Sequence, residues 1–244
     1  MDDHDLIIRL QDISFAYSGG TAVFDGLSLS FQKGDRMGLV GPNGSGKTTL
    51  FHIIMGLLKP TAGRIEIFGK AVQGEKDFRE VRQRIGLLFQ DADDQLFSPT
   101  VLEDVAFGPL NLGKSQGEAK AIARKTLKAL GFAGYEDRLT HKLSGGEKRL
   151  VSLATVLAME PEVLLLDEPT TGLDEATGKR FVEILKGLGL SYILVSHNID
   201  LLMETTTRIA SLVNGKLSLD EESVPHTHMH THKYGRYSHD HGRI

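Results

Sequence analysis

The sequence predicts an α/β fold with a mainly parallel sheet, accompanied by an antiparallel β subdomain, a helical insertion and a disordered tail. Strand-like and helix-like stretches alternate along most of the chain, as in folds whose helices cover a parallel sheet. A glycine-rich loop at 41–48 lies between a predicted strand and a predicted helix. An apolar stretch at 163–166 ends in two adjacent acids, and we interpret it as a buried strand.

The N-terminal part of the chain predicts both kinds of β-structure. Apolar, partly alternating runs at 6–13 and 21–31 are separated by a turn at 17–20, which indicates antiparallel strands. A short strand at 36–40 leads into the glycine-rich loop, and residues 47–58 then have apolar side chains at helical spacing.

The remaining elements follow the same logic of pattern and composition. Strands are expected at 63–69, 85–89, 163–168, 191–196 and 216–219, and helices at 115–130 and 175–188. A more helical insertion occupies about 91–160. We therefore expect one domain over 1–222, followed by a flexible tail at 223–244.

Composition excludes several classes of function. The 28 Lys and Arg against 32 Asp and Glu give a net charge of −4, so nucleic acid is not expected as a partner. The absence of cysteine excludes disulfides and thiolate zinc sites, which fits a reducing compartment. The acidic N-terminus does not resemble a secretory signal, and no apolar run approaches the roughly 18 residues of a membrane helix.

The loop at 41–48 satisfies the P-loop pattern G-x-x-x-x-G-K-[ST] in its required strand–loop–helix context. Backbone N–H groups of such a loop surround phosphate oxygens, Lys47 reaches the β- and γ-phosphates, and Thr48 can bind Mg²⁺. This predicts a P-loop NTPase fold. The predicted nucleotide-binding residues include Gly41, Pro42, Asn43, Gly44, Ser45, Gly46, Lys47, Thr48 and Thr49.

The two acids after the apolar strand can have different roles. Successive side chains on a strand point to opposite faces, so Asp167 and Glu168 need not face the same group. We predict that Asp167 contributes to the Mg²⁺ site and that Glu168 deprotonates an attacking water.

The stretch Leu143-Ser144-Gly145-Gly146-Glu147 resembles the signature loop of ATP-binding cassette (ABC) proteins. It follows the P-loop by about 100 residues and precedes the strand at 163–166, as in that family. The resemblance covers residues 5–220 and implies an ABC-type domain that binds and hydrolyses ATP with Mg²⁺. Glu147 departs from the glutamine most common in the family, but the Ser144 hydroxyl and the neighbouring glycine N–H groups remain, so we expect activity.

The resemblance also implies roles for isolated residues. Gln90 matches the glutamine that senses Mg²⁺ and water, and His197 matches the switch histidine on the γ-phosphate. Asp174 belongs to a loop that touches the opposing subunit, and Tyr17 matches the aromatic residue that stacks on adenine. Two subunits would pair head to tail, as a homodimer or with a related ABC ATPase, so that the Ser144 loop of one closes over the ATP held by the other.

Residues 91–112 resemble the segment after the glutamine loop in energy-coupling-factor importers, and within them most resemble the cobalt and nickel ATPases. In this family an integral membrane subunit docks near that segment, here 91–108. We therefore predict an ATPase that powers import of cobalt or nickel from the cytoplasmic face of the membrane. The alternatives are a vitamin importer of the same type, a soluble ABC ATPase without a transport role, and a metal-storage module.

The tail carries a separate metal-binding hypothesis. Histidines alternate at 226–232, and imidazole is a good ligand for Ni²⁺ and Co²⁺. An inert polar tail is the alternative. The candidate ligands are His226, His228, His230, His232, His239 and His241.

Overall fold

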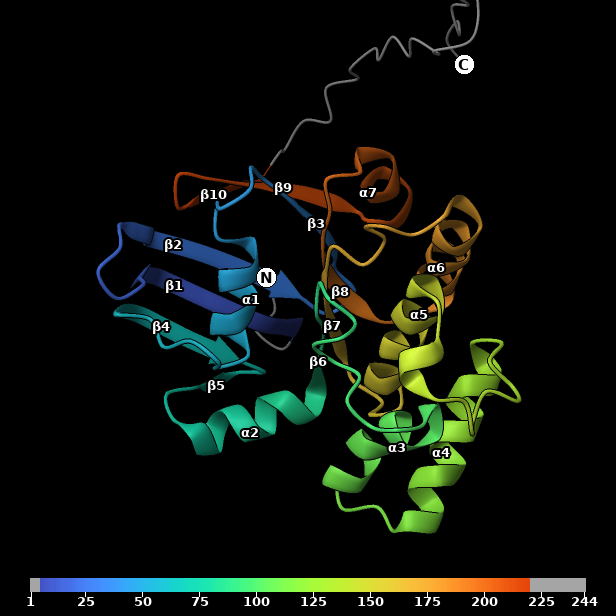
Figure 1. Cartoon of the computed structure of the whole chain (residues 1–244). Helices are drawn as coiled ribbons and strands as arrows, with labels where there is room; N and C mark the ends of the chain where they lie inside the picture. The colour runs from blue at the N-terminus through green and yellow to red at the C-terminus, as the bar shows by residue number, and fades with distance from the viewer. Residues whose placement is uncertain (1–4, 220–244) are drawn as a thin grey trace, which may run out of the picture.

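The computed structural model describes residues 5–219, which form two sheets surrounded by helices (Figure 1). One sheet has six strands in the order β10-β9-β3-β8-β7-β6, and the other has four in the order β2-β1-β4-β5. The strands are β1 (Leu6–Ala16), β2 (Ala22–Gln32), β3 (Arg36–Val40), β4 (Ala62–Ile67), β5 (Lys70–Ala71), β6 (Ile85–Leu88), β7 (Val163–Asp167), β8 (Ser191–Val195), β9 (Arg208–Val213) and β10 (Lys216–Leu219). The predicted α/β fold is confirmed.

Helices cover the six-stranded sheet and form a separate cluster beside it (Figure 1). Within residues 5–219, no helix combines the length and the apolar character needed to cross a bilayer. The helices are α1 (Lys47–Ile54), α2 (Glu75–Arg84), α3 (Val101–Asn111), α4 (Gln116–Ala129), α5 (Gly145–Leu157), α6 (Glu175–Gly187) and α7 (Ile199–Thr205), with a 3₁₀ turn at Thr140–Lys142.

Strand β7 lies inside the large sheet and is apolar on both faces. It pairs in parallel with β6 and β8, and all its residues are buried. Val163 and Leu165 pack into the core around α1, whereas Leu164 and Leu166 pack into the core beneath the other helices. This alternation fixes the directions of the polar residues that follow.

Helix α1 lies between the two sheets (Figure 1). Its buried residues Leu50, Phe51, Ile53 and Ile54 share one core with residues of both sheets. The predicted continuation of this helix to residue 58 is wrong. Gly56 adopts a φ of 69°, and the N–H of Leu57 bonds the carbonyl of His52, which is a Schellman ending.

The predicted helical insertion contains α3, α4 and α5, which pack against one another. Each begins with a capping box, in which a hydroxyl and a glutamate three residues later bond each other's backbone N–H. The three pairs are Thr100 with Glu103, Ser115 with Glu118, and Ser144 with Glu147. Ser144 is therefore held at the N-terminus of a well-defined helix.

Candidate nucleotide-binding site

The loop between β3 and α1 has a backbone that only glycine adopts readily. Gly41 and Gly46 have φ values of 157° and 102°. A Cβ on Gly41 would lie 2.3 Å from the Leu212 carbonyl oxygen, and one on Gly46 would lie 2.7 Å from the Phe24 ring. Both glycines are therefore required for the close packing of this loop.

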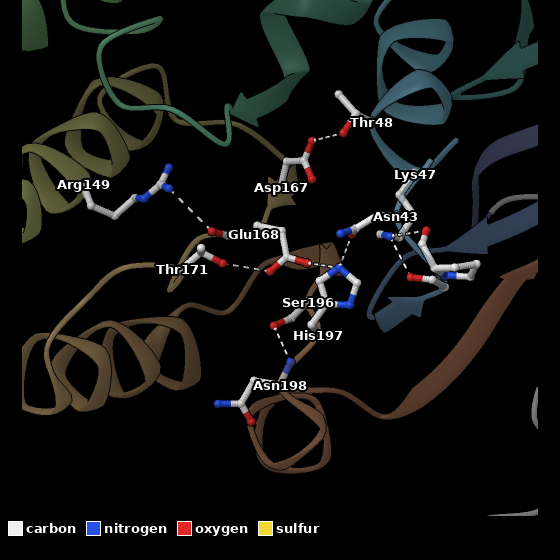
Figure 2. A network of polar contacts seen from close by, with 12 residues as sticks. Asn43, Lys47, Thr48, Arg149, Asp167, Glu168, Thr171, Ser196, His197 and Asn198 are labelled. Carbon is white, nitrogen blue, oxygen red and sulfur yellow. Dashed lines mark hydrogen bonds and ion pairs between the residues drawn. The ribbon is translucent and has the colours of Figure 1, made fainter. Parts of the chain in front are cut away.

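The Lys47 side chain is largely buried and is hydrogen-bonded to the backbone of the loop that precedes it. Its Nζ donates hydrogen bonds to the carbonyl oxygens of Gly41 at 2.8 Å and Pro42 at 3.1 Å (Figure 2). Both partners are uncharged, so the positive charge remains available to an anion. Together with the N-terminus of α1, it makes this loop suited to phosphate.

Asp167 and Thr48 meet as the strand alternation predicts. Asp167 faces α1, and its Oδ2 accepts a 2.6 Å hydrogen bond from the Thr48 hydroxyl (Figure 2). Burial raises the pKa of Asp167 above its usual value, partly offset by the Thr48 hydrogen bond and nearby positive charge. A hydroxyl beside a buried carboxylate is a donor set that suits Mg²⁺.

Glu168 turns away from Asp167 and lies beside His197. Its φ of 46° is uncommon for a residue with a side chain and redirects the chain as β7 ends. Thr171 donates a 3.0 Å hydrogen bond to Glu168 Oε2, whereas Oε1 is buried without a hydrogen-bond partner among residues 5–219. His197 Nε2 lies 3.4 Å from this Oε1 and 3.0 Å from Asn43 Oδ1, which accepts its hydrogen bond (Figure 2).

This arrangement brings the P-loop and two strand ends together. Asn43 belongs to the loop after β3, Glu168 follows β7 and His197 follows β8. Glu168 Oε1 therefore lies where these segments meet, without a hydrogen-bond donor among the described residues.

Arg149 is a buried residue of the site that the sequence analysis did not identify. Its guanidinium donates to the Phe89 carbonyl at 2.6 Å, to the Gln90 carbonyl, and to the Glu168 carbonyl at 3.5 Å. Burial lowers the pKa of Arg149 below its usual value. Arg149 thus joins α5 to the segment after β6 and to the end of β7. The sequence carries no local signal for this role, because Arg149 follows Glu147 and Lys148 in a charged first turn and its partners are distant in the chain.

A cleft of about 650 Å³ runs from Thr48 and Asp167 to the start of α5. Gln90 is exposed on one side of it, and the loop that contains Thr171 lines another. The predicted Mg²⁺ residues Thr48, Gln90 and Asp167 therefore line one cleft. His52, one helical turn after Thr48, lines it as well and was not predicted.

The predicted signature loop forms the first turn of α5. The Ser144 hydroxyl accepts the N–H of Glu147 at 3.2 Å, and the Glu147 carboxylate accepts the N–H of Ser144 at 2.8 Å. Tyr135 also donates to this carboxylate at 2.8 Å. The Ser144 N–H and the Tyr135 hydroxyl hold the pKa of Glu147 below its usual value. Its negative charge is thus bound within its own chain, while Gly145 has open space around it.

Two further predicted residues, Tyr17 and Asp174, are not among the residues that line the cleft. Tyr17 is half exposed; its ring packs edge-on against Phe15, and its hydroxyl is 3.0 Å from the Thr49 hydroxyl. Asp174 caps α6 by accepting the N–H of Thr177 at 3.0 Å. The six candidate histidines of the tail lie outside the described residues.

The geometry defines a P-loop protein whose site suits a nucleoside triphosphate. Comparison of the sequence with known families finds a match to the ABC transporter family over residues 24–171. The chain belongs to the ATP-binding proteins of this family and is an ATP-hydrolysing enzyme.

Two curated relatives extend the match to most of the chain. The energy-coupling factor transporter ATP-binding protein EcfA of Methanothermobacter thermautotrophicus is 44% identical over 86% of this chain and 69% of its own length. The cobalt import ATP-binding protein CbiO of Rhodobacter capsulatus is also 44% identical, over 86% of this chain and 77% of its own.

Two solved structures share the fold. The cbiO1 protein of Clostridium perfringens, described as part of the transporter complex cbiONQ, is 36% identical with a TM-score of 0.79, covering 88% of each chain. The dimeric cassette MJ0796 bound to ADP and phosphate is 28% identical with a TM-score of 0.78, covering 86% of this chain and 96% of its own. The resemblance predicted from the signature loop and the segment after Gln90 is confirmed.

Proposed function

We propose that this protein powers the import of cobalt or nickel through a separate integral membrane partner, by closing as a dimer around ATP. The proposal is supported by the phosphate loop, by the acid pair after β7 and by relatives named for cobalt import and for energy-coupling factor transport. The observation that carries the transport role is an exposed aromatic surface beside the nucleotide cleft.

In the proposed reaction, Lys47 and the loop N–H groups bind the phosphates. Glu168 accepts the proton of the attacking water through its unpartnered Oε1, and His197 faces the γ-phosphate beside it. The proton moves from water to Glu168 as the bond between the water oxygen and phosphorus forms and the bond to ADP breaks. Tyr17 offers its exposed ring to adenine.

Thr48, Asp167 and Gln90 fit a bound Mg²⁺. The first two already place a hydroxyl and a carboxylate 2.6 Å apart, and both oxygens are ligands that Mg²⁺ prefers. A positive ion would also offset the cost of burying the Asp167 charge. When bound, Mg²⁺ supplies charge neutralisation to the phosphates.

We propose that the second half of each ATP site comes from another subunit, either an identical chain or a related ABC ATPase. Ser144, Gly145 and Gly146 present helix N–H groups, and a helix N-terminus favours an anion. The open space at Gly145 lets another molecule approach the backbone. Asp174 lies in the loop proposed to contact that subunit. Closure would depend on the γ-phosphate and end with hydrolysis.

The proposed membrane-docking surface consists of Phe97 and Phe107 with the acids that precede them in the chain. Phe97 is 65% exposed and Phe107 is 43% exposed, although their rings pack edge-to-face at 4.7 Å. A hollow of about 280 Å³ adjoins Phe97 and includes Asp93 and His141. Exposed aromatic pairs of this kind mark interaction sites.

The test is Phe97→Asp, with Met203→Asp as the matched control. Met203 is similarly exposed, at 63%, but lies on α7. Phe97→Asp should reduce capture of membrane proteins from the native host and abolish cobalt or nickel uptake, while ATP hydrolysis by the isolated subunit persists. Met203→Asp should leave both unchanged. Uptake of a vitamin instead of a metal would contradict cobalt or nickel as the transported substrate.

The tail proposal is tested separately. Removing residues 224–244 should leave ATP hydrolysis intact and remove Ni²⁺ or Co²⁺ binding measured by calorimetry. That binding should weaken below about pH 6, because protonated imidazole does not bind metal. Equal metal binding by the full-length and shortened chains would eliminate the tail from the mechanism.

A further inference from the structure

The acid of the signature turn lies beside the groups that we propose to bind the phosphates of another subunit's ATP. Glu147 is in the first turn of α5, and its carboxylate accepts the N–H of Ser144 at 2.8 Å. The phosphates that this turn would meet are themselves negative. A carboxylate at this place repels them unless a cation offsets its charge, because charges near a protein surface act over several ångströms.

Arg138 brings a positive charge to this carboxylate. Its Nη1 lies 3.4 Å from Glu147 Oε1, the same oxygen that accepts the Tyr135 hydroxyl at 2.8 Å. The Arg138 guanidinium also stacks on the Tyr135 ring, with its central carbon 3.6 Å from the ring centre. Stacking on an aromatic face orients a planar guanidinium. Two contacts therefore keep the charge of Arg138 beside Glu147.

The backbone around Arg138 is held in place as well. The N–H of Arg138 donates to the Tyr135 carbonyl at 3.0 Å, and the Arg138 carbonyl accepts the N–H of Val101 at 3.0 Å. The Tyr135 ring packs edge-on against Phe132, with the ring centres 4.9 Å apart. These contacts attach the loop that carries Arg138 to the start of α3.

The two cations that follow Glu147 in the chain are directed elsewhere. Lys148 pairs with Asp93 at 2.6 Å. Arg149 is buried and donates to backbone carbonyls of the segment after β6. Among the residues that the structure describes, Arg138 is consequently the cation paired with Glu147.

Folding stability does not account for this ion pair. The side chain of Arg138 is 52% exposed and that of Glu147 is 28% exposed. Ion pairs with such access to water contribute little to the free energy of unfolding. Because both side chains remain partly open to solvent, their charges also act on an anion that approaches from outside.

We propose that Arg138 neutralises Glu147 so that the signature turn can bind the phosphates of ATP held by an opposing subunit. Arg138 acts through Glu147 and sets the ATP concentration at which two subunits close. This role rests on the proposed closure around ATP and adds a residue to it. The glutamine most common at the position of Glu147 in the family is neutral, so the need for a counter-charge arises from the glutamate of this chain.

Substitutions at position 138 separate charge from shape. Arg138→Gln removes the charge but keeps an N–H donor for the carboxylate, whereas Arg138→Lys keeps the charge. Glu147→Gln removes the charge that needs an opposite charge and keeps an oxygen that can accept the Ser144 N–H. Arg124→Gln is the matched control, because Arg124 is exposed on α4 and its replacement changes the net charge of the chain equally.

Light scattering of the full-length Glu168→Gln protein gives the ATP concentration at which half of the protein is dimeric. Arg138→Gln should raise this concentration about threefold to tenfold at about 50 mM salt, and the increase should shrink at about 500 mM because salt screens exposed charges. Arg138→Lys and Arg124→Gln should leave the concentration within about twofold of that of the parent. In protein that also carries Glu147→Gln, Arg138→Gln should have little effect.

Two results would overturn the role of Arg138 alone. One is a parent that dimerises with ATP at the same concentration as Arg138→Gln at low salt, and the other is an increase that persists unchanged after Glu147→Gln. Melting curves check that each variant is folded, and Arg138→Met, with the same expectation, replaces Arg138→Gln if the latter is not. No increase in mass with ATP in the Glu168→Gln parent itself would overturn the proposed closure and the role of Arg138 together.

Discussion

Two regions of the molecule, the nucleotide end of the large sheet and the helical region of α3 to α5, differ in the burial of their chemically important side chains. Around Lys47 and Asp167, charged groups are buried and bonded to partners within the chain. Around Phe97 and Phe107, apolar rings are exposed although they pack against each other. The first region holds its geometry by its own contacts, whereas the second presents a surface that another molecule can cover.

This difference shows which kind of contact holds each region in place. Backbone turns at the ends of β3, β7 and β8 place the catalytic candidates, and strand pairing fixes those ends relative to one another. The docking segment between β6 and α3, which carries Phe97, depends instead on side-chain bonds from Gln95, Arg149 and Asp104. Substitutions can therefore disturb one region and leave the other intact.

The largest effect should come from Glu168→Gln, which changes only the first region. The amide retains the shape and the Thr171 contact but is a poor base. Turnover should fall by about 10²–10⁴-fold, the usual contribution of a positioned general base, with ATP affinity retained. Steady-state hydrolysis and nucleotide titration measure both, with Glu175→Gln, at an exposed position in the first turn of α6, as the control. Hydrolysis equal to that of the unmodified protein would contradict the role of Glu168.

The contrast also explains how far the sequence alone could lead. Asp167 and Glu168 follow an apolar strand, and strict alternation was enough to predict that they face different partners. The meeting of His197 with Asn43 depends on strand order, which has no local signal, and the family resemblance indicated only that His197 lies at the γ-phosphate. These residues are 154 positions apart in the chain.

In the helical region the sequence predicted the insertion itself but not the bounds of most of its helices. The sequence analysis predicted a helical insertion at about 91–160 but gave bounds for only one helix in it, at 115–130, and it omitted α2, α7, β5 and β9. Local signals existed, because Thr100 with Glu103 and Ser144 with Glu147 both fit the capping-box pattern. The roles of Gln95 and Arg149 could not be assigned from sequence, since tertiary packing brings them next to partners about 60 residues away in the chain.

The next largest effect should come from Ser144→Arg in the Glu168→Gln background. A bulky cation at the signature turn should prevent the ATP-dependent increase in mass that light scattering detects. Ser115→Arg is the matched control, because it breaks an equivalent capping box on α4 and should cost a similar ~1 kcal/mol of stability. Loss of the mass increase in both variants would mean that destabilisation is responsible, and loss in neither would contradict the dimer contact.

Arg149→Met should produce a smaller effect that reaches both regions. It removes donors from the carbonyls of Phe89, Gln90 and Glu168, two of them near the docking segment and one at the nucleotide end. Hydrogen bonds to charged groups contribute about 1.5–3 kcal/mol each, and relaxation recovers part, so unfolding by urea should show a loss of about 2–4 kcal/mol. Lys148→Met, which removes a partly exposed ion pair, should cost about 0–1 kcal/mol. Equal losses of unfolding free energy in the two variants would contradict the role of Arg149 in joining the two regions.

The smallest effect concerns Asp104, a buried acid behind the docking surface. Its Oδ1 accepts the N–H groups of Phe97 at 3.1 Å and Ser98 at 2.8 Å, while Oδ2 has no hydrogen-bond partner within the described part of the chain. Burial raises the pKa of Asp104 above its usual 3.8, and these bonds offset the rise only in part. The folded protein therefore binds this proton more tightly than the unfolded chain does.

The charged form of Asp104 therefore lowers the stability of the folded protein at neutral pH. This stability is regained as the pH falls from the pKa of Asp104 in the folded protein toward its pKa in the unfolded chain. Asp104→Asn is neutral and keeps an acceptor for both N–H groups, so it should match or exceed the unmodified protein at pH 7 by up to about 1 kcal/mol. This advantage should shrink on acidification.

Asp77→Asn is the control and should behave in the opposite way. The N–H groups of Gln73 and Gly74 lower the pKa of Asp77, so its charged form stabilises the folded protein. Its replacement should therefore reduce stability at pH 7, and the deficit should vanish in acid. Melting temperatures of the three proteins between about pH 2 and pH 7 make the measurement, because the Asp77 contribution is lost only below its unfolded pKa of 3.8. A difference between Asp104→Asn and the unmodified protein that does not change with pH would show that the cost at this position is steric packing rather than buried charge.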